Sequence, residues 1–112
     1  DGFWVGFRCG PEACYVLLLT SRDAQLHRVP TSGEYDGDRQ NLTTAPFTPD
    51  SEWHNLTIRV RGGKIEVEQD GKLLLQYTDE KPLAAGGVTL CARRWSQSTG
   101  DTVVQISQFE VE

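Results

Sequence analysis

Residues 53–77 contain enough regular pattern to assign a fold class, and they read WHNLTIRVRGGKIEVEQDGKLLLQY. Apolar and polar side chains alternate in three short runs, which is typical of β-strands that bury one face. In the first run the predicted core face carries His54, Leu56, Ile58 and Val60. The opposite face carries Asn55, Thr57, Arg59 and Arg61. We therefore expect a three-stranded antiparallel meander.

The two turns of this meander fix its register. Gly62-Gly63 is predicted to form a two-residue hairpin with positive φ at both glycines, which places Arg59 opposite Glu66. At the second turn a two-residue loop would mix the two faces, so a three-residue loop, Gln69-Asp70-Gly71, is expected. The partners predicted from that loop are Val67 with Leu73, Ile65 with Leu75, and Glu68 with Lys72.

The same alternation recurs along the whole chain, and no window shows a helical stripe. Segment 31–52 is rich in Ser, Thr, Gly, Asp and Pro, so we expect a long loop that can hide one edge strand. The size suits one domain, and residues 1–112 are predicted to form an all-β, antiparallel two-sheet sandwich or jelly roll. The predicted strands are 3–8, 14–20, 25–29, 53–61, 64–68, 72–77, 87–93 and 102–111, the last with a β-bulge near Ser107-Gln108.

Composition disfavours several classes of partner. The chain has 16 acidic and 11 scattered basic residues and a net charge of −5, which argues against nucleic acid and an acidic membrane surface. The longest apolar run, residues 15–19, is strand-sized, so membrane insertion is not expected. The chain lacks methionine and begins almost inside an apolar segment, so we expect a processed chain or a domain excised from a larger protein.

Cysteines and glycosylation sequons point to the secretory pathway. Cys9 and Cys14 bracket a turn-like segment and are predicted to form a disulfide, the alternative being two unpaired small apolar side chains. Cys91 is expected to be a buried free thiol, with pairing to another chain as the alternative. Asn41-Leu-Thr and Asn55-Leu-Thr match the acceptor triplet for N-glycans. The predicted location is secreted or at the extracellular face of the cell surface.

Two family resemblances rest on short motifs. The residue 53–77 stretch, with Gly86-Gly87-Val-Thr-Leu and Ile106-Ser-Gln-Phe-Glu-Val, resembles concanavalin A-like and laminin G-like jelly rolls. Phe3-Trp-Val, Thr78-Asp-Glu-Lys-Pro-Leu and Trp95-Ser-Gln-Ser-Thr-Gly are similar to the small domain named after farnesoic acid O-methyltransferase. Both resemblances imply a β fold used for ligand binding or adhesion. The chain has no glycine-rich strand-to-helix turn for S-adenosylmethionine, so neither methyltransferase activity nor any cofactor is expected.

The strand-end loop 93–101 is the predicted ligand-binding site. Aromatic faces stack on sugar rings, and guanidinium groups hold carboxylates or sulfates. Tyr35, in the acidic segment 35–38, is expected to join this surface, while two acids alone make a weak calcium site. No metal site is expected, because the histidines do not fall at zinc-finger spacing with the cysteines. The predicted ligand-binding residues are Arg93, Arg94, Trp95, Gln97 and Tyr35.

Enzymatic activity is the less favoured interpretation. Glu66, Glu68 and Asp70 alternate as glycosidase carboxylates can, but Arg59 and Lys72 are predicted to neutralise two of them. Neither His27 nor His54 has an obvious partner, and Trp4 and Trp53 are assigned to packing. We expect a non-catalytic recognition module for a glycan or an extracellular protein. The alternative is an interaction domain that another domain or chain completes.

Overall fold

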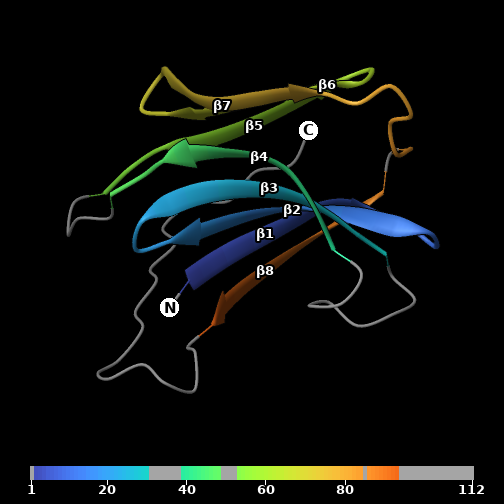
Figure 1. The fold of residues 1–112 in the computed structure, drawn as a ribbon, viewed down its shortest axis with the longest axis horizontal. Coiled ribbons are helices and arrows are strands. Elements are labelled where there is room, and N and C mark those ends of the chain that lie inside the picture. Colours follow the sequence, from blue (N-terminus) through green and yellow to red (C-terminus); the bar gives the residue numbers. More distant parts are fainter. Residues whose placement is uncertain (1, 31–38, 49–52, 85, 94–112) are drawn as a thin grey trace.

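Eight strands form two antiparallel sheets in a computed structural model, which describes residues 2–30, 39–48, 53–84 and 86–93, without the side chains of residues 2 and 88–93 (Figure 1). The first sheet has the order β4-β3-β2-β1-β8, and the second has the order β5-β6-β7. The predicted all-β, two-sheet sandwich is thus confirmed. The strands are β1 (Gly2–Cys9), β2 (Ala13–Thr20), β3 (Asp23–Pro30), β4 (Gln40–Pro46), β5 (Leu56–Arg61), β6 (Lys64–Gln69), β7 (Lys72–Thr78) and β8 (Gly87–Arg93).

Strand positions agree with the sequence pattern except at the start of β5. The long segment 31–52 does contain an edge strand, β4, which pairs with β3. Strand β5 begins at Leu56, three residues later than predicted. Trp53 consequently lies before the sheet and is 64% exposed, so its assignment to packing is wrong. The predicted strand 102–111 and its bulge lie outside the described residues.

The main core lies between the two sheets. Apolar side chains from both sheets form one buried cluster there. Burying a large apolar side chain contributes about 1.5–3 kcal/mol, so this cluster holds the two sheets together. Leu56, Ile58 and Val60 pack against it as predicted, whereas His54 is exposed and its assignment to the core face is wrong. The buried members of the cluster are Phe7, Ala13, Tyr15, Leu17, Ala24, Leu26, Ile65, Val67, Leu75 and Leu83.

The opposite face of the five-stranded sheet is also buried around β2. Cys14, Val16 and Val29 form a second cluster, against which Trp4 and Cys9 pack. The packing role predicted for Trp4 is therefore confirmed. Because both of its faces are covered, β2 reads as a nearly continuous apolar run instead of an alternating one.

The turn after β6 differs from the prediction. Asp70 and Gly71, with φ of 53° and 82°, form a two-residue turn, so the three-residue loop is wrong. Both angles are positive, as a type I′ hairpin requires. The observed partners are Gln69 with Lys72, Glu68 with Leu73, Val67 with Leu75, and Ile65 with Tyr77. A register shift between Val67 and Glu68 restores the core phase, so a bulge in the ladder does what the longer loop was expected to do.

The turn after β5 has the predicted length. Arg61 pairs with Lys64 across Gly62-Gly63, and Arg59 lies opposite Glu66 as expected. Only Gly62 has positive φ, 60°, so the prediction of positive φ at both glycines is wrong. Gly63 is needed for another reason: a Cβ there would collide with the carbonyl oxygen of Asp79. The Asp79 amide donates to the Gly63 carbonyl over 2.8 Å, which ties the chain after β7 to this hairpin.

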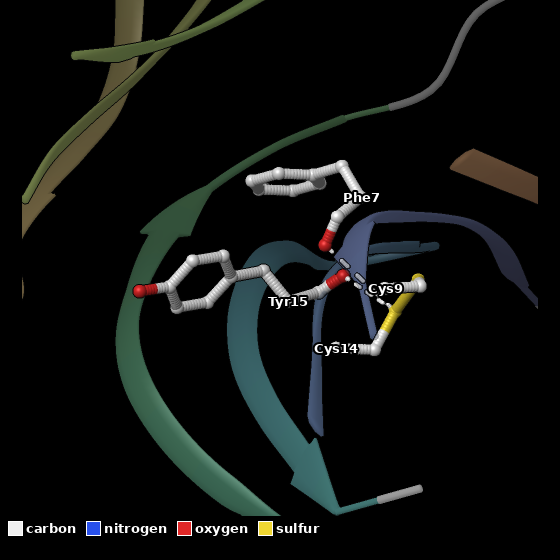
Figure 2. The surroundings of a disulfide bond; sticks show 4 residues. All are labelled: Phe7, Cys9, Cys14 and Tyr15. Carbon is white, nitrogen blue, oxygen red and sulfur yellow. Dashed lines mark hydrogen bonds between the residues drawn. A yellow bond between two sulfur atoms is a disulfide. The ribbon is translucent and has the colours of Figure 1, made fainter. Parts of the chain in front are cut away.

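The predicted disulfide joins Cys9 at the end of β1 to Cys14 at the start of β2, with their Cα atoms 4.2 Å apart (Figure 2). It therefore closes the hairpin that connects the first two strands. Cys91 lies on β8 opposite Trp4, and because its side chain is not described, the free-thiol assignment stays a prediction.

Candidate functional site

A row of three polar side chains crosses one end of the five-stranded sheet. Tyr15 on β2 pairs with Arg28 on β3, and Arg28 pairs with Gln40 on the edge strand β4. Since side chains alternate along a strand, Arg28 shares the inward face of β3 with the fully buried Leu26. The apolar core thus gives way to polar groups at this end, with a buried phenol innermost and an exposed amide at the edge.

Asp79, which follows β7, connects this row to the other sheet. One of its carboxylate oxygens, Oδ2, accepts hydrogen bonds from the Tyr15 hydroxyl at 2.7 Å and from Arg28 Nη1 at 2.8 Å. The other oxygen, Oδ1, accepts from the Lys81 amide at 2.9 Å. Arg28 Nη1 also donates to the Lys81 carbonyl, and the Leu83 amide donates to the Tyr15 hydroxyl. Both oxygens of Asp79 are therefore occupied by donors.

The protonation states at this cluster follow from those contacts. Burial would raise the pKa of Asp79, but hydrogen bonds from Tyr15 and Lys81, together with the charge of Arg28, outweigh it and hold the pKa below its ordinary 3.8. Burial and the hydrogen bond to Asp79 raise the pKa of Tyr15 above its ordinary 10.0. At neutral pH the carboxylate is thus ionised and the phenol is protonated.

A hollow of about 410 Å³ opens beside this cluster, between the edge strand β4 and the end of β7. Ligand pockets are commonly about 300–1,000 Å³ and use a few placed polar groups to orient the ligand. Six of the eight lining residues carry charged, amide or aliphatic hydroxyl side chains, and Tyr77 adds one aromatic ring. The lining residues are Arg28, Gln40, Leu42, Tyr77, Thr78, Asp79, Glu80 and Lys81.

Comparison with known families identifies the family of this chain. The family model of the 3-keto-alpha-glucoside-1,2-lyase-like domain matches residues 5–111. The chain belongs to this family. The chain itself matches no curated protein and no solved structure. The lyase-like domain is accordingly a carbohydrate-related β-sandwich, whereas the finer jelly-roll and farnesoic acid O-methyltransferase resemblances stay predictions.

Most of the ligand-binding residues predicted from the sequence lie outside the described residues. Tyr35, Arg94, Trp95 and Gln97 are among them, and Arg93 is described only as the last residue of β8, where it pairs with Gly2. Their role stays a prediction. Both predicted glycosylation asparagines, Asn41 and Asn55, are exposed in the lyase-like domain.

Sequence reasoning missed the hollow at Arg28 and Asp79, although one signal was present. In β3 the inward positions run Ala24, Leu26, Arg28, so a cation occupies a core phase. A charge that is even partly buried favours a partner, and the partner of Arg28 is Asp79, which lies 51 residues away in the chain. Nothing local marks that pairing.

The carboxylates of β6 are engaged in ion pairs on the outer face of the second sheet. Glu68 lies 2.6 Å from Arg59, a diagonal partner, while Glu66 lies 3.7 Å from Lys64. The side-chain pair expected from Arg59 facing Glu66 is therefore replaced by the diagonal one. Such exposed pairs are worth about 0–1 kcal/mol each, so they neutralise the face more than they stabilise it.

Both histidines have partners that the sequence did not suggest. His54 Nδ1 lies 2.6 Å from Asp70 Oδ2, and the Asn55 amide donates to Asp70 Oδ1. The Asn55 bond first, and then His54, lower the pKa of Asp70. His27 is 1% exposed, and its Nε2 lies 2.8 Å from Gln25 Oε1. Its Nδ1 has no hydrogen-bond partner among the described residues.

Metal-ligand chemistry has no obvious place among these groups. In the part of the chain that the structure describes, no three His, Cys, Asp or Glu side chains are grouped so that they could hold a metal ion. No helix within the described residues is long and apolar enough to cross a membrane.

Proposed function

We propose that this lyase-like domain binds a carbohydrate, without turning it over, in the hollow between β4 and β7. The main support for this proposal is the polar row that runs from Tyr15 through Arg28 to Gln40. Asp79 holds Arg28 in this row, and Arg28, Gln40 and Asp79 all line the hollow. Sugars are recognised through several directed hydrogen bonds and one apolar ring contact. The hollow offers guanidinium, amide, hydroxyl and carboxylate groups around Tyr77, and the family is carbohydrate-related.

The state of Asp79 supports binding over catalysis. A lyase that cleaves a 3-keto-glucoside across C1 and C2 needs a base for the C2 proton, which the neighbouring ketone acidifies, and an acid for the departing oxygen. Asp79 is a poor base, because three donors occupy its two oxygens and its pKa is lowered. Tyr15 is a poor acid, because its proton is already donated to Asp79 and its pKa is raised.

Calorimetry with α-glucosides and their 3-keto derivatives tests this proposal, and two glutamines provide a matched pair. Gln40 lines the hollow, whereas Gln76 lies on β7 opposite Glu66 and does not line it. Both are exposed, so alanine at either position should leave the fold intact. We expect Gln40→Ala to weaken binding about tenfold, the loss of one or two hydrogen bonds, and Gln76→Ala to change it less than twofold.

Two outcomes would contradict the proposal. Equal effects of the two glutamine variants would place the ligand elsewhere. Release of the leaving group from a 3-keto-α-glucoside, abolished by Asp79→Asn, would make the domain a catalyst.

The strand-end loop 93–101 remains a second proposed contact surface for the same ligand. A glycan array with the wild type and Trp95→Ala tests it, and an unchanged signal would exclude Trp95. Strong self-association without any glycan signal would instead favour the assembly role, in which another domain or chain completes the sandwich.

We also infer an extracellular location. The Cys9–Cys14 disulfide supports it, because such bonds form in oxidising compartments. The exposure of Asn41 and Asn55 supports it too, since a glycan needs an exposed acceptor. Mass spectrometry of the protein from its native source should find glycans at these asparagines, and their absence would remove one of the two supports.

A further inference from the structure

We propose that the Cys9–Cys14 disulfide is a redox switch that controls the shape of the carbohydrate hollow. The effect on carbohydrate binding rests on the proposed function, but the structural link between the disulfide and the wall of the hollow does not. Each cysteine has a neighbour in the chain that reaches across to the segment after β7. Arg8 precedes Cys9, and Tyr15 follows Cys14.

Both neighbours hold the same residue, Leu83. Arg8 Nη1 donates to the Leu83 carbonyl over 2.9 Å, and the Tyr15 hydroxyl accepts from the Leu83 amide over 3.1 Å. Leu83 itself is 8% exposed and belongs to the main core. Its two main-chain polar groups are therefore both satisfied by side chains that flank the disulfide.

The same contacts fix one wall of the hollow. Asp79, Glu80 and Lys81 line it, and they lie between β7 and Leu83. The Tyr15 hydroxyl holds the start of this wall through Asp79, and Arg8 holds its end through Leu83. Arg8 Nη2 also donates to the Val60 carbonyl on β5 over 3.3 Å. The disulfide thus lies at the base of two anchors for a wall that is distant in sequence.

The backbone at Arg8 depends on its surroundings. Its φ is 49°, in the left-handed region that residues other than glycine seldom occupy. The pairing of β1 with β8 shifts register between Gly6 and Cys9, so the ladder does not hold this residue directly. A covalent link one residue later restrains it, and cutting that link allows Arg8 to return to an extended conformation and withdraw its side chain.

The bond is placed so that it can be reduced and the product accommodated. Cys9 is partly exposed, whereas Cys14 is buried, so we expect an incoming thiolate to attack the Cys9 sulfur. Cys14 Sγ lies 3.4 Å from the Tyr15 carbonyl oxygen and 3.8 Å from that of Phe7, and Figure 2 shows both carbonyls turned toward the sulfur. Once reduced, Cys14 carries an S–H that can donate to them.

The reaction is an ordinary thiol–disulfide exchange with a dithiol. The dithiol supplies two electrons and two protons, the Cys9–Cys14 bond breaks, two thiols form, and the dithiol closes to its own disulfide. Reduced protein should keep its two sheets, because the main core does not include either cysteine. Only the wall from Asp79 to Leu83 should loosen.

Amide hydrogen exchange tests this link without any sugar. The wild type is measured oxidised and after dithiothreitol, with thiol alkylation to confirm reduction. We expect the protection of the Leu83 amide to fall about tenfold or more on reduction, which is the loss of one to two net hydrogen bonds. The Val67 amide, in the core strand β6, should stay protected. A Cys9→Ser/Cys14→Ser variant should show the amide protection of the reduced wild type, and dithiothreitol should not change it.

Several outcomes distinguish the redox switch from a purely stabilising disulfide and from the proposed carbohydrate binding. Unchanged Leu83 protection in alkylated protein overturns the switch, and so does an equal loss at Val67, which would make the disulfide a global staple. A second variant, Arg8→Ala with the disulfide intact, should lower Leu83 protection by itself. If Leu83 responds but oxidised protein binds no α-glucoside, the switch stands and the proposed function fails. If oxidised protein binds and reduced protein binds equally well, the control of the hollow is refuted.

Discussion

The Tyr15 hydroxyl can be removed with almost no change in shape, and this makes Tyr15→Phe a sharp test of the polar cluster. The ring of Tyr15 is fully buried and packs against Phe7 with centroids 5.5 Å apart and planes tilted by 37°. Phenylalanine keeps that packing. What disappears is the donor to Asp79 at 2.7 Å and the acceptor for the Leu83 amide at 3.1 Å.

The size of the effect follows from those two contacts. A hydrogen bond to a charged group contributes about 1.5–3 kcal/mol, and a buried donor left without an acceptor costs about 1–3 kcal/mol. Leu83 is 8% exposed, so its amide has little access to water. Arg28 still neutralises Asp79 in the variant, which limits the first loss. We therefore expect the free energy of unfolding to fall by about 2–4 kcal/mol.

Urea unfolding at pH 7 measures this change, provided the m-value stays constant. Tyr77→Phe is the control, because it removes the same atom from a partly buried ring whose hydroxyl has no hydrogen bond among the described residues. The control should lie within about 0.5 kcal/mol of the wild type. If Tyr15→Phe costs no more than Tyr77→Phe, the cluster does not join the sheets as we argue.

The pH dependence of the same pair gives an independent check. Tyr15 has a raised pKa in the folded state, so the folded protein binds more protons than the unfolded chain above pH 10. The wild type therefore loses stability as pH rises from 10 through that folded pKa, and Tyr15→Phe lacks this loss. The difference between the two proteins should shrink in that range. A constant difference would mean that burial and the hydrogen bond to Asp79 do not raise the pKa of the phenol.

Three further predictions concern other positions. Gly63→Ala should destabilise the domain by about 1–3 kcal/mol in thermal unfolding, because the new Cβ meets the Asp79 carbonyl. Gly10→Ala is the control, because Gly10 has open space around it, and it should cost less than about 1 kcal/mol. Equal costs would contradict the close approach of Gly63 to Asp79. The pKa of His27 is lowered by burial first and by the charge of Arg39 second, so the unfolded chain binds the extra proton and stability should fall as pH drops below 6.5. A His27→Gln variant that shows the same fall would exclude His27 as its cause. Trp95→Ala should reduce signals on a glycan array, and full retention would remove that loop from the binding surface.

The fold could be predicted because each strand repeats a local rule. Alternation along Leu56, Ile58 and Val60 is a property of neighbouring residues, and it survives in the structure as the core side of β5. The register at the Asp70-Gly71 turn failed for the opposite reason. Turn chemistry favoured two residues and core phase favoured three, and the chain satisfied both by inserting a bulge, which no local pattern reports.

The candidate site could not be predicted, because its parts come from three distant segments. Tyr15 looks like an ordinary member of an apolar strand, Arg28 shows only that a cation occupies a core phase, and Asp79 looks like a turn residue. Only the pairing of β2 with β3 and the path of the chain after β7 bring them within hydrogen-bond distance. Loop residues with conspicuous chemistry, such as Trp95, drew attention instead, since sequence shows chemical type but not convergence.

The way Asp79 is satisfied also explains how one cluster can serve both stability and recognition. A carboxylate that already accepts from Tyr15, Arg28 and the Lys81 amide has little left to offer a ligand. It does, however, fix the guanidinium plane, because Arg28 Nη1 is held by Asp79 and by the Lys81 carbonyl. A guanidinium has five donors in a rigid fork, so anchoring one nitrogen restricts the others, and Arg28 lines the hollow. The proposed function therefore assigns the ligand contacts to the rest of that fork and to Gln40 at the edge. On that proposal, substitutions at the rim should change affinity, and substitutions at the buried end should change stability.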